Sequence, residues 1–140
     1  MVVQVSLQYV DGLKKKCSDV SNVDFVGLIP MNEVLPMTKK ADVIICMTSP
    51  HDFNCSNAFA NKQFEAMICG RPIICTKGTY PGKITEKEKC GIVADYTKEA
   101  LKKAILILRD DPKLCEELGK NALNSAIREY NWEKQEKKLL

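Results

Sequence analysis

The chain has 140 residues, of which 45% are hydrophobic and 28% are charged, and its formal net charge is +3. These proportions are average for a globular protein, so they exclude intrinsic disorder, and the chain is long enough to bury one core. No apolar run approaches the roughly 18 residues of a membrane span. The small positive charge does not predict binding to nucleic acid, because the lysine clusters fall on the solvated faces of predicted helices.

The first 60 residues alternate between the apolar period of strands and that of helices. In chain order they predict a strand at 2–6, a helix at 10–20, a strand at 23–26 that ends at Gly27, a helix at 33–40 with Pro36 in its first turn, a strand at 41–47 and a polar loop at 48–60. The strand at 41–47 is apolar almost throughout, which is typical of a strand covered on both faces.

The second part of the chain begins with a short helix that Asn61 caps and Gly70 ends. After it we predict a strand at 72–76, a turn at 77–80, a strand at 90–94, a helix capped by Thr97 and a long helix begun by Asp111 and Pro112. Trp132, beyond the last helix, is expected to pin the terminal segment to the domain. This alternation predicts an α/β fold, a Rossmann-like doubly wound parallel sheet in a single domain that ends in long helices.

Apolar residues at helical spacing predict which face of each later helix is buried. The predicted buried residues are Phe64, Met67 and Ile68 in the first helix, Leu101, Ala104, Ile105 and Leu108 in the second, and Leu114, Leu118, Ala122, Ala126 and Ile127 in the third.

The helix from Asn61 leads through Gly70 directly into a buried strand, an arrangement that aims a helix N-terminus at the edge of a parallel sheet. Glu65 lies in the early part of this helix, near the boundary between core and solvent. One interpretation is a surface glutamate stabilised by the helix dipole. The functional interpretation is a carboxylate that binds ribose hydroxyls, while the N–H groups of 61–63 face a diphosphate and Lys62 adds a positive charge.

The seven cysteines include no Cys-x-x-Cys pair, and Cys46 and Cys75 fall inside predicted strands. This pattern suits a reducing cytoplasm better than a disulfide framework, so we expect a cytoplasmic protein. The single histidine, His51, lies near Cys55. Two such residues are too few for a zinc site, and no third group is identified that would orient them for nucleophilic catalysis.

Several segments together resemble one known family. They are Phe-Val-Gly-Leu-Ile at 25–29, Ala-Asp-Val-Ile-Ile at 41–45, the whole of 61–74, Gly-Ile-Val at 91–93 and Tyr-Asn-Trp-Glu at 130–133. In this order they resemble the C-terminal half of a family 4 glycosyltransferase of the GT-B architecture (glycosyl transferases group 1). The resemblance covers nearly the whole chain, and its most specific part is Asn-Lys-x-Phe-Glu-Ala-Met followed by Gly-Arg-Pro.

The resemblance implies a domain, residues 1–140, that binds a nucleotide-diphosphate sugar for a retaining transfer to a glycan or lipid-linked acceptor. No metal or other cofactor is expected, because the nucleotide-sugar is the donor substrate. By resemblance, Glu65 holds the ribose, Leu28 and Ile29 lie beside the base, and the loop after Met47 and the turn at Gly78 approach the diphosphate and sugar. Asn61 and Lys62 complete the set of donor-binding residues.

The sequence departs from the family pattern in ways that limit what it can do alone. Asn57 stands where many members have a second glutamate near the transferred sugar, so no catalytic residue is assigned. A first strand and helix with a basic pair, and the N-terminal acceptor domain, have no counterpart here. We therefore expect the chain to need an acceptor domain or a partner chain, and to be inactive by itself. The acceptor half could also associate peripherally with a membrane.

Two other interpretations remain open at the level of the sequence. The chain can be a non-catalytic interaction module, or a truncated remnant, that keeps the fold without transfer activity. It can also be a different doubly wound protein such as a flavodoxin-like receiver, although Asp42, at the start of its strand, is misplaced for one. The sugar, the base, the acceptor and the oligomeric state are not determined by the sequence.

Overall fold

The computed structural model describes residues 7–58 and 60–137. The chain divides into two compact units, with the boundary between residues 31 and 32. The first unit contains one helix, α1 (Leu7–Lys16), where a helix was predicted. The strand predicted at 23–26 is wrong, because these residues are irregular and pair with no other described strand. A strand exists only through the hydrogen bonds of its neighbours, which local apolar character cannot supply. The strand predicted at 2–6 lies outside the described residues.

The second unit contains the remaining elements. In chain order these are α2 (Met31–Lys40, beginning two residues earlier than predicted), β1 (Ile44–Cys46), α3 (Phe53–Asn57), α4 (Asn61–Ile68), β2 (Ile73–Thr76), α5 (Tyr80–Glu88), β3 (Gly91–Ala94), α6 (Lys98–Asp110), α7 (Pro112–Arg128) and α8 (Trp132–Glu136). All three described strands lie where the sequence predicted strands. Side chains of Thr97 and Asp111 accept bonds from the N–H groups of Ala100 and Leu114, so both predicted caps of α6 and α7 are confirmed.

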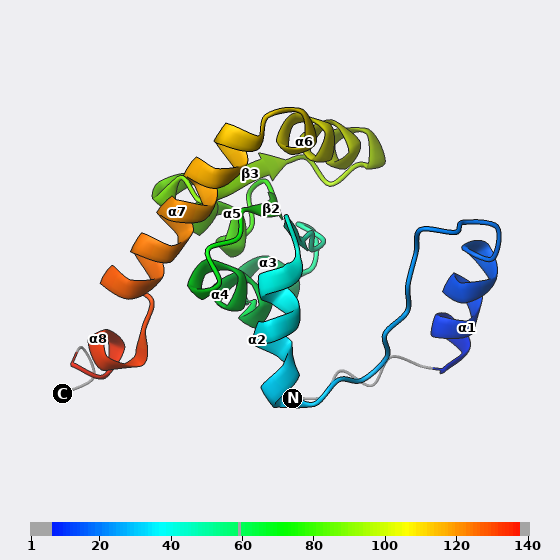
Figure 1. The fold of residues 1–140 in the computed structure, drawn as a ribbon, viewed down its shortest axis with the longest axis horizontal. Coiled ribbons are helices and arrows are strands. Elements are labelled where there is room, and N and C mark those ends of the chain that lie inside the picture. Colours follow the sequence, from blue (N-terminus) through cyan, green and yellow to red (C-terminus); the bar gives the residue numbers. More distant parts are fainter. Residues whose placement is uncertain (1–6, 59, 138–140) are drawn as a thin grey trace. The chain divides into compact units, whose positions relative to one another are not determined.

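The three strands form one parallel sheet in the order β1-β2-β3. Ile44 pairs with Ile73 and Cys46 with Cys75, so the carboxyl ends of β1 and β2 meet at one edge. Helices cover both faces: α4 and α5 lie on one side of the strands and α6 on the other (Figure 1). This is the doubly wound α/β arrangement that the sequence predicted.

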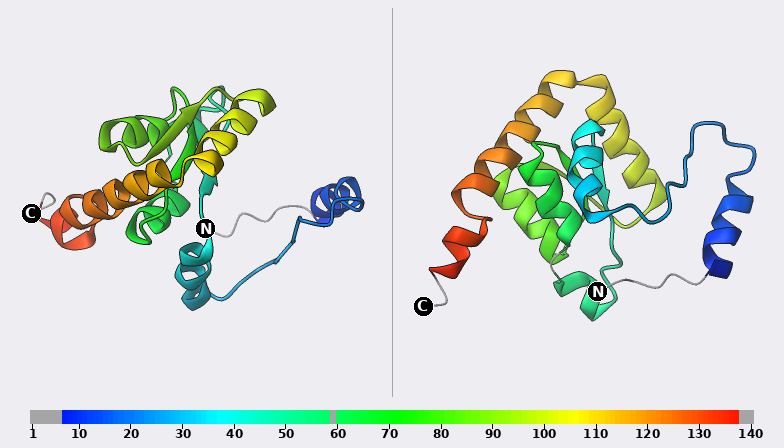
Figure 2. Two further views of the ribbon diagram at one scale, coloured as in Figure 1. Left: turned by 45° about the horizontal axis from the view of Figure 1, so that its top comes forward. Right: turned by 60° about the horizontal axis from the view of Figure 1, so that its bottom comes forward.

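The core follows the alternation of side chains along β2. Ile73 and Cys75 face the side that α4 and α5 cover, and Ile74 faces the side that α6 covers. Helix α7 contributes to both sides, because it crosses from the end of α6 past the sheet towards α8 (Figure 2). All three of these β2 side chains are fully buried, as expected of a strand between two helical layers.

Three local predictions are wrong. Helix α5 was not predicted at all, although Thr79 caps it and Pro81 stands in its first turn, a recognised start signal. The predicted loop 48–60 contains the short helix α3. Pro36 is in the interior of α2 and not in its first turn, so its missing N–H removes one backbone hydrogen bond of that helix.

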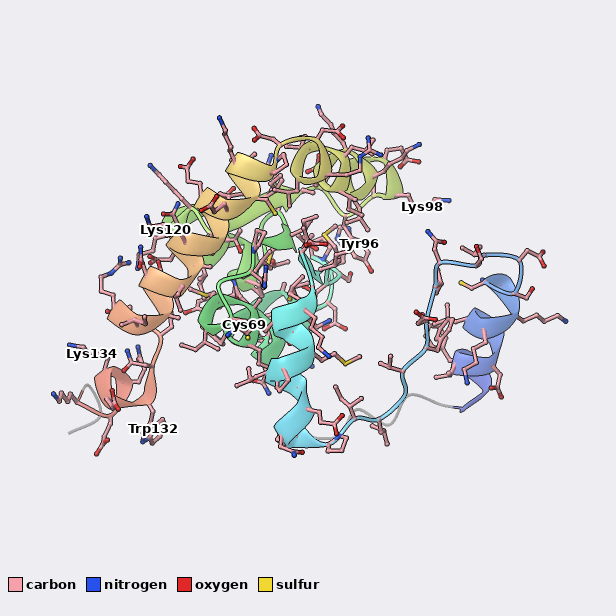
Figure 3. All side chains as sticks on the ribbon, in the orientation of Figure 1. Cys69, Tyr96, Lys98, Lys120, Trp132 and Lys134 are labelled. Carbon is pink, nitrogen blue, oxygen red and sulfur yellow. The ribbon has the colours of Figure 1, made fainter. Side chains whose placement is uncertain are left out.

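The predicted buried faces are confirmed for some residues and wrong for others. Met67, Ala104, Leu108, Leu118, Ala122 and Ala126 are buried, whereas Ile68, Ile105 and Ile127 are exposed. Trp132 is 73% exposed and lies on α8 away from the sheet, so it does not pin the terminal segment (Figure 3). Tyr130 does so instead: its ring packs against Phe64, with ring centres 5.7 Å apart.

A buried carboxylate fastens the C-terminal helices to α5. The Glu88 carboxylate accepts hydrogen bonds from Ser125 Oγ at 2.8 Å and Tyr130 OH at 3.1 Å, and it also pairs with Arg128 and Lys87. Burial acts to raise the pKa of Glu88, but these four partners outweigh it and hold that pKa below its usual value. Burial and the Glu88 charge raise the pKa of Tyr130, which therefore remains a hydrogen-bond donor.

Replacing Glu88 by glutamine should therefore destabilise the second unit. We expect a loss of about 1–2 kcal/mol at neutral pH, since charge-assisted hydrogen bonds to a buried group are removed. The pKa of Glu88 is lower in the folded state than in the unfolded state. The wild-type carboxylate therefore adds to the free energy of unfolding above the usual glutamate pKa, and this addition is lost as the pH falls through the lowered, folded-state pKa. Urea unfolding across the acid range measures this, with the exposed Glu86→Gln as control; equal stability of both variants would contradict it.

Candidate functional site

The carboxyl ends of β1 and β2 and the N-termini of two helices form the edge where a ligand would bind in a doubly wound fold. Helix α4 follows β1 by way of residues 47–60, and α5 follows β2 through the turn at Lys77 and Gly78. We call this region the ligand edge, and define it as residues 47–49, 61–65 and 76–82.

The N-terminus of α4 has no side-chain cap. Asn61 was predicted to be the cap, and this is wrong: Ala60 occupies the cap position and Asn61 is the first helical residue. In contrast, side chains of Thr79, Thr97, Asp111 and Asn131 cap α5, α6, α7 and α8. Helix α4 thus presents its positive end to the ligand edge without a side chain that neutralises it, which is favourable for an anion.

Threonines organise the ends of the strands, a feature that sequence analysis missed. The backbone N–H of Thr48 donates to Thr76 Oγ1 at 3.0 Å, which ties the chain after β1 to the end of β2. Thr79 Oγ1 donates to the Thr76 carbonyl at 2.7 Å and accepts from the Gly82 N–H at 3.2 Å. The hydroxyl of Thr48 itself is buried and has no hydrogen-bond partner among the described residues, so a polar atom at this edge is left unsatisfied.

The predicted donor-binding residues of α4 lie together on its first turns. Asn61 and Lys62 are exposed and Glu65 is half-buried. No hydrogen bond or ion pair of the Glu65 carboxylate is found within 7–58 and 60–137. The carboxylate therefore has its full capacity to accept hydrogen bonds from a ligand, and it lies one turn from the uncapped helix end.

Two further predicted residues are in the same unit. Gly78 is exposed in the turn between β2 and α5, with a φ of +79°. Asn57 ends α3, and its Nδ2 donates to the Phe53 carbonyl and to Ser56 Oγ, both at 3.0 Å. The Asn57 amide is therefore directed at its own helix. Leu28 and Ile29 belong to the first unit, where Leu28 is 93% exposed, and their role beside a base stays a prediction.

Buried thiols lie beneath the ligand edge. Cys46 and Cys75 are directly paired across β1 and β2, and both are fully buried. The pKa of Cys75 is raised by its hydrogen bond with Cys46 and by burial. The pKa of Cys46 is lowered to about 7 by the same hydrogen bond and by the positive charge of Lys62. Cys90 precedes β3 and lies at the other end of the strands, where burial raises its pKa to about 11. The six cysteines whose side chains are described are all free thiols.

A separate groove of about 1030 Å³ lies at the opposite end of the strands. Its wall includes Asp42, Arg71, Leu108, Cys115 and Lys120, which come from the amino ends of β1 and β2 and from α6 and α7. It therefore shares no residue with the ligand edge. The described residues contain no group of three metal-binding side chains. None of the described helices combines the length and the apolar character needed to cross a bilayer.

Comparison with known proteins gives a consistent result. The profile of the family described as "Glycosyl transferases group 1" matches residues 6–125. The glycosyltransferase YtcC of Bacillus subtilis is 29% identical over 103 residues, which are 72% of this chain and 24% of that protein. A glycosyltransferase of Methanocaldococcus jannaschii is 24% identical over 128 residues, 89% of this chain and 31% of that protein.

Solved structures show the same fold. Sucrose-phosphate synthase from Thermosynechococcus elongatus matches with a TM-score of 0.76 and 26% identity over 94% of this chain and 33% of that one. The C-terminal domain of a glycosyl transferase group 1 family protein (LpcC) from Francisella tularensis matches with a TM-score of 0.71 and 22% identity, over 90% of this chain and 64% of that one.

The chain spans only about a quarter to a third of the two curated relatives, and the part it spans has the fold of a GT-B C-terminal domain. The family profile covers far more than half of its residues, including all of β1 to β3 and the ligand edge. The chain therefore belongs to the glycosyl transferases group 1 family.

Proposed function

We propose that the second unit binds the donor of a glycosyltransferase, a nucleotide-diphosphate sugar, at the ligand edge. One observation carries the proposal: the N-terminus of α4, which no side chain caps, and the Glu65 carboxylate, which has no partner among the described residues, lie one turn apart on the same helix. The helix end suits the negative diphosphate, and the carboxylate suits the hydroxyls of the ribose.

Each residue has a distinct part in this proposal. The Glu65 carboxylate accepts hydrogen bonds from the ribose, and the N–H groups of Asn61 and Lys62 donate to the diphosphate. Lys62, exposed beside them, adds a positive charge. The Thr48 hydroxyl, buried at the end of β1 without a described partner, is available to a polar group of the donor. Gly78 lets the chain pass close to the phosphates without a side chain in the way.

We further propose that transfer is retaining, needs no metal and serves glycan synthesis with a glycan or lipid-linked acceptor. A glycosyltransferase of this family works between two domains, and this chain matches only a minor part of its relatives. The chain then supplies the donor half, and the acceptor half comes from further sequence or a partner chain. The free thiols of the described cysteines support a cytoplasmic location.

Isothermal titration of the 140-residue chain with UDP, GDP and ADP tests the proposal. We expect one of them to bind with a dissociation constant in the roughly micromolar to millimolar range that substrates span, and the matching nucleotide-sugar to compete for the same site. Added EDTA should leave the affinity unchanged if no metal takes part. Absence of binding by all three nucleotides at saturating concentrations would favour the alternative, an interaction module that keeps the fold without donor binding.

A further inference from the structure

Gln63 is a polar side chain that is fully buried. It lies in the first turn of α4, between the exposed Lys62 and the half-buried Phe64, and its exposed fraction is 0%. Its backbone N–H, predicted from the sequence to face a diphosphate, donates instead to the Ala60 carbonyl at 2.9 Å. A buried amide is unfavourable unless its donors and acceptor find partners.

The partners of Gln63 lie in the first turns of another helix. Its Nε2 donates to the Pro81 carbonyl at 2.8 Å and to Thr85 Oγ1 at 3.1 Å, and both residues belong to α5. The orientation of the amide follows from these contacts, because a carbonyl only accepts. Its own Oε1 is buried with no described partner. Leucine or methionine would fill this space without such an unsatisfied oxygen, so packing alone does not explain the residue.

Helix α5 is itself fixed to the end of β2. Thr79 joins the Thr76 carbonyl to the first turn of α5, and Gly82 lies so close to the Thr76 carbonyl that an added Cβ would overlap it. Gln63 connects α4 to this fixed point. The hydrogen bonds of one amide therefore set how far the N-terminus of α4 lies from the turn at Gly78.

We propose that Gln63 is a positioning residue of the donor site: it does not contact the ligand, but it holds the N-terminus of α4 and the turn into α5 at the separation that a diphosphate bridges. The inference rests on the proposed function. A diphosphate carries charge on two phosphates and needs donors on both sides, whereas a monophosphate needs only one helix end. The role of Gln63 should therefore depend on the number of phosphates in the ligand.

The substitution Gln63→Met tests this without leaving a new unsatisfied group. The Thr85 hydroxyl already donates to the Pro81 carbonyl at 2.9 Å, so this carbonyl keeps a hydrogen-bond partner when the amide is gone. The variant should therefore keep its thermal unfolding midpoint or raise it, since the orphaned Oε1 is also removed. We expect UDP to bind roughly tenfold more weakly, because the net free energy of one hydrogen bond corresponds to up to about a tenfold change in the dissociation constant. The affinity for UMP should change much less. If GDP or ADP is the nucleotide bound, its own mono- and diphosphate are compared.

Gln135→Met is the matched control. Gln135 also donates through Nε2 to a backbone carbonyl, that of Glu129 at 2.8 Å, but it lies in α8 away from the ligand edge. This variant should bind both nucleotides as the wild type does. The inference is overturned if Gln63→Met binds UDP like the wild type, or if it weakens UDP and UMP by the same factor. Failure of the wild type to bind any of the three diphosphates overturns the proposed function first, and the inference with it.

Discussion

Replacing Glu65 by alanine is expected to weaken nucleotide binding by roughly 10- to 100-fold, since charge-assisted hydrogen bonds are worth about 1.5–3 kcal/mol each. In the proposed site this carboxylate is the only described group assigned to the ribose, and no other side chain competes for its oxygens among the described residues. Isothermal titration with the nucleoside diphosphate that the wild type binds measures the effect.

Two further variants separate the role of the carboxylate from other effects of the change. Glu65→Gln keeps an oxygen that accepts hydrogen bonds but loses the charge, so its affinity should lie between those of the wild type and Glu65→Ala. Glu86→Ala removes an exposed glutamate from α5 and should leave the affinity unchanged. If Glu65→Ala binds nucleotide as tightly as the wild type, the assignment of Glu65 to the ribose is wrong. The proposal that α4 binds the diphosphate is tested separately, by whether the wild type binds a nucleoside diphosphate.

Replacing Gly91 by alanine should have the largest effect on stability. Gly91 begins β3 and pairs with Ile73 of β2. A Cβ at this position would overlap the Ile73 carbonyl oxygen and lie 2.7 and 2.8 Å from its C and N atoms. These are backbone atoms of the central strand and cannot rotate away. We expect a loss of about 3 kcal/mol or more, the upper end of what overpacking costs, or failure to fold.

Urea unfolding followed by circular dichroism measures this loss. Gly12→Ala is the matched control, because Gly12 lies in α1 with nothing within 4 Å of an added Cβ. This variant should be neutral or more stable by up to about 1 kcal/mol, the difference in helix propensity between the two residues. A Gly91→Ala variant as stable as the wild type would show that β2 and β3 are not paired in the register described.

Much of the fold is encoded in local patterns. The apolar runs at 41–47, 72–76 and 90–94 predicted all three described strands, and Thr97 and Asp111 predicted the starts of α6 and α7. Such signals are readable because a cap or a strand period involves neighbouring residues only. Helix α5 had a comparable signal in Thr79 and Pro81, but the glycines around it indicated a turn instead.

Other features depend on residues that are far apart in the sequence. Helical spacing placed Ile105 and Ile127 on buried faces, yet both are exposed, because the extent of a buried face is set by the element that covers it. Trp132 has the size of an anchor but lies in solvent, while Tyr130 reaches Phe64 and Glu88 across many residues of chain. The side chains that organise the candidate site, Thr76 and Gln63 among them, have no distinguishing local pattern.

The sequence by itself determined the fold class and the family, through the segment 61–74 and the order of the strands around it, because these follow from local periods and motif spacing. It also placed Glu65 on a helix that begins at the edge of a parallel sheet. Only the tertiary structure decided that this helix end is uncapped and that Gln63 joins it to α5. Those properties depend on which partners each polar group meets after folding, and the partners are contributed by distant parts of the chain.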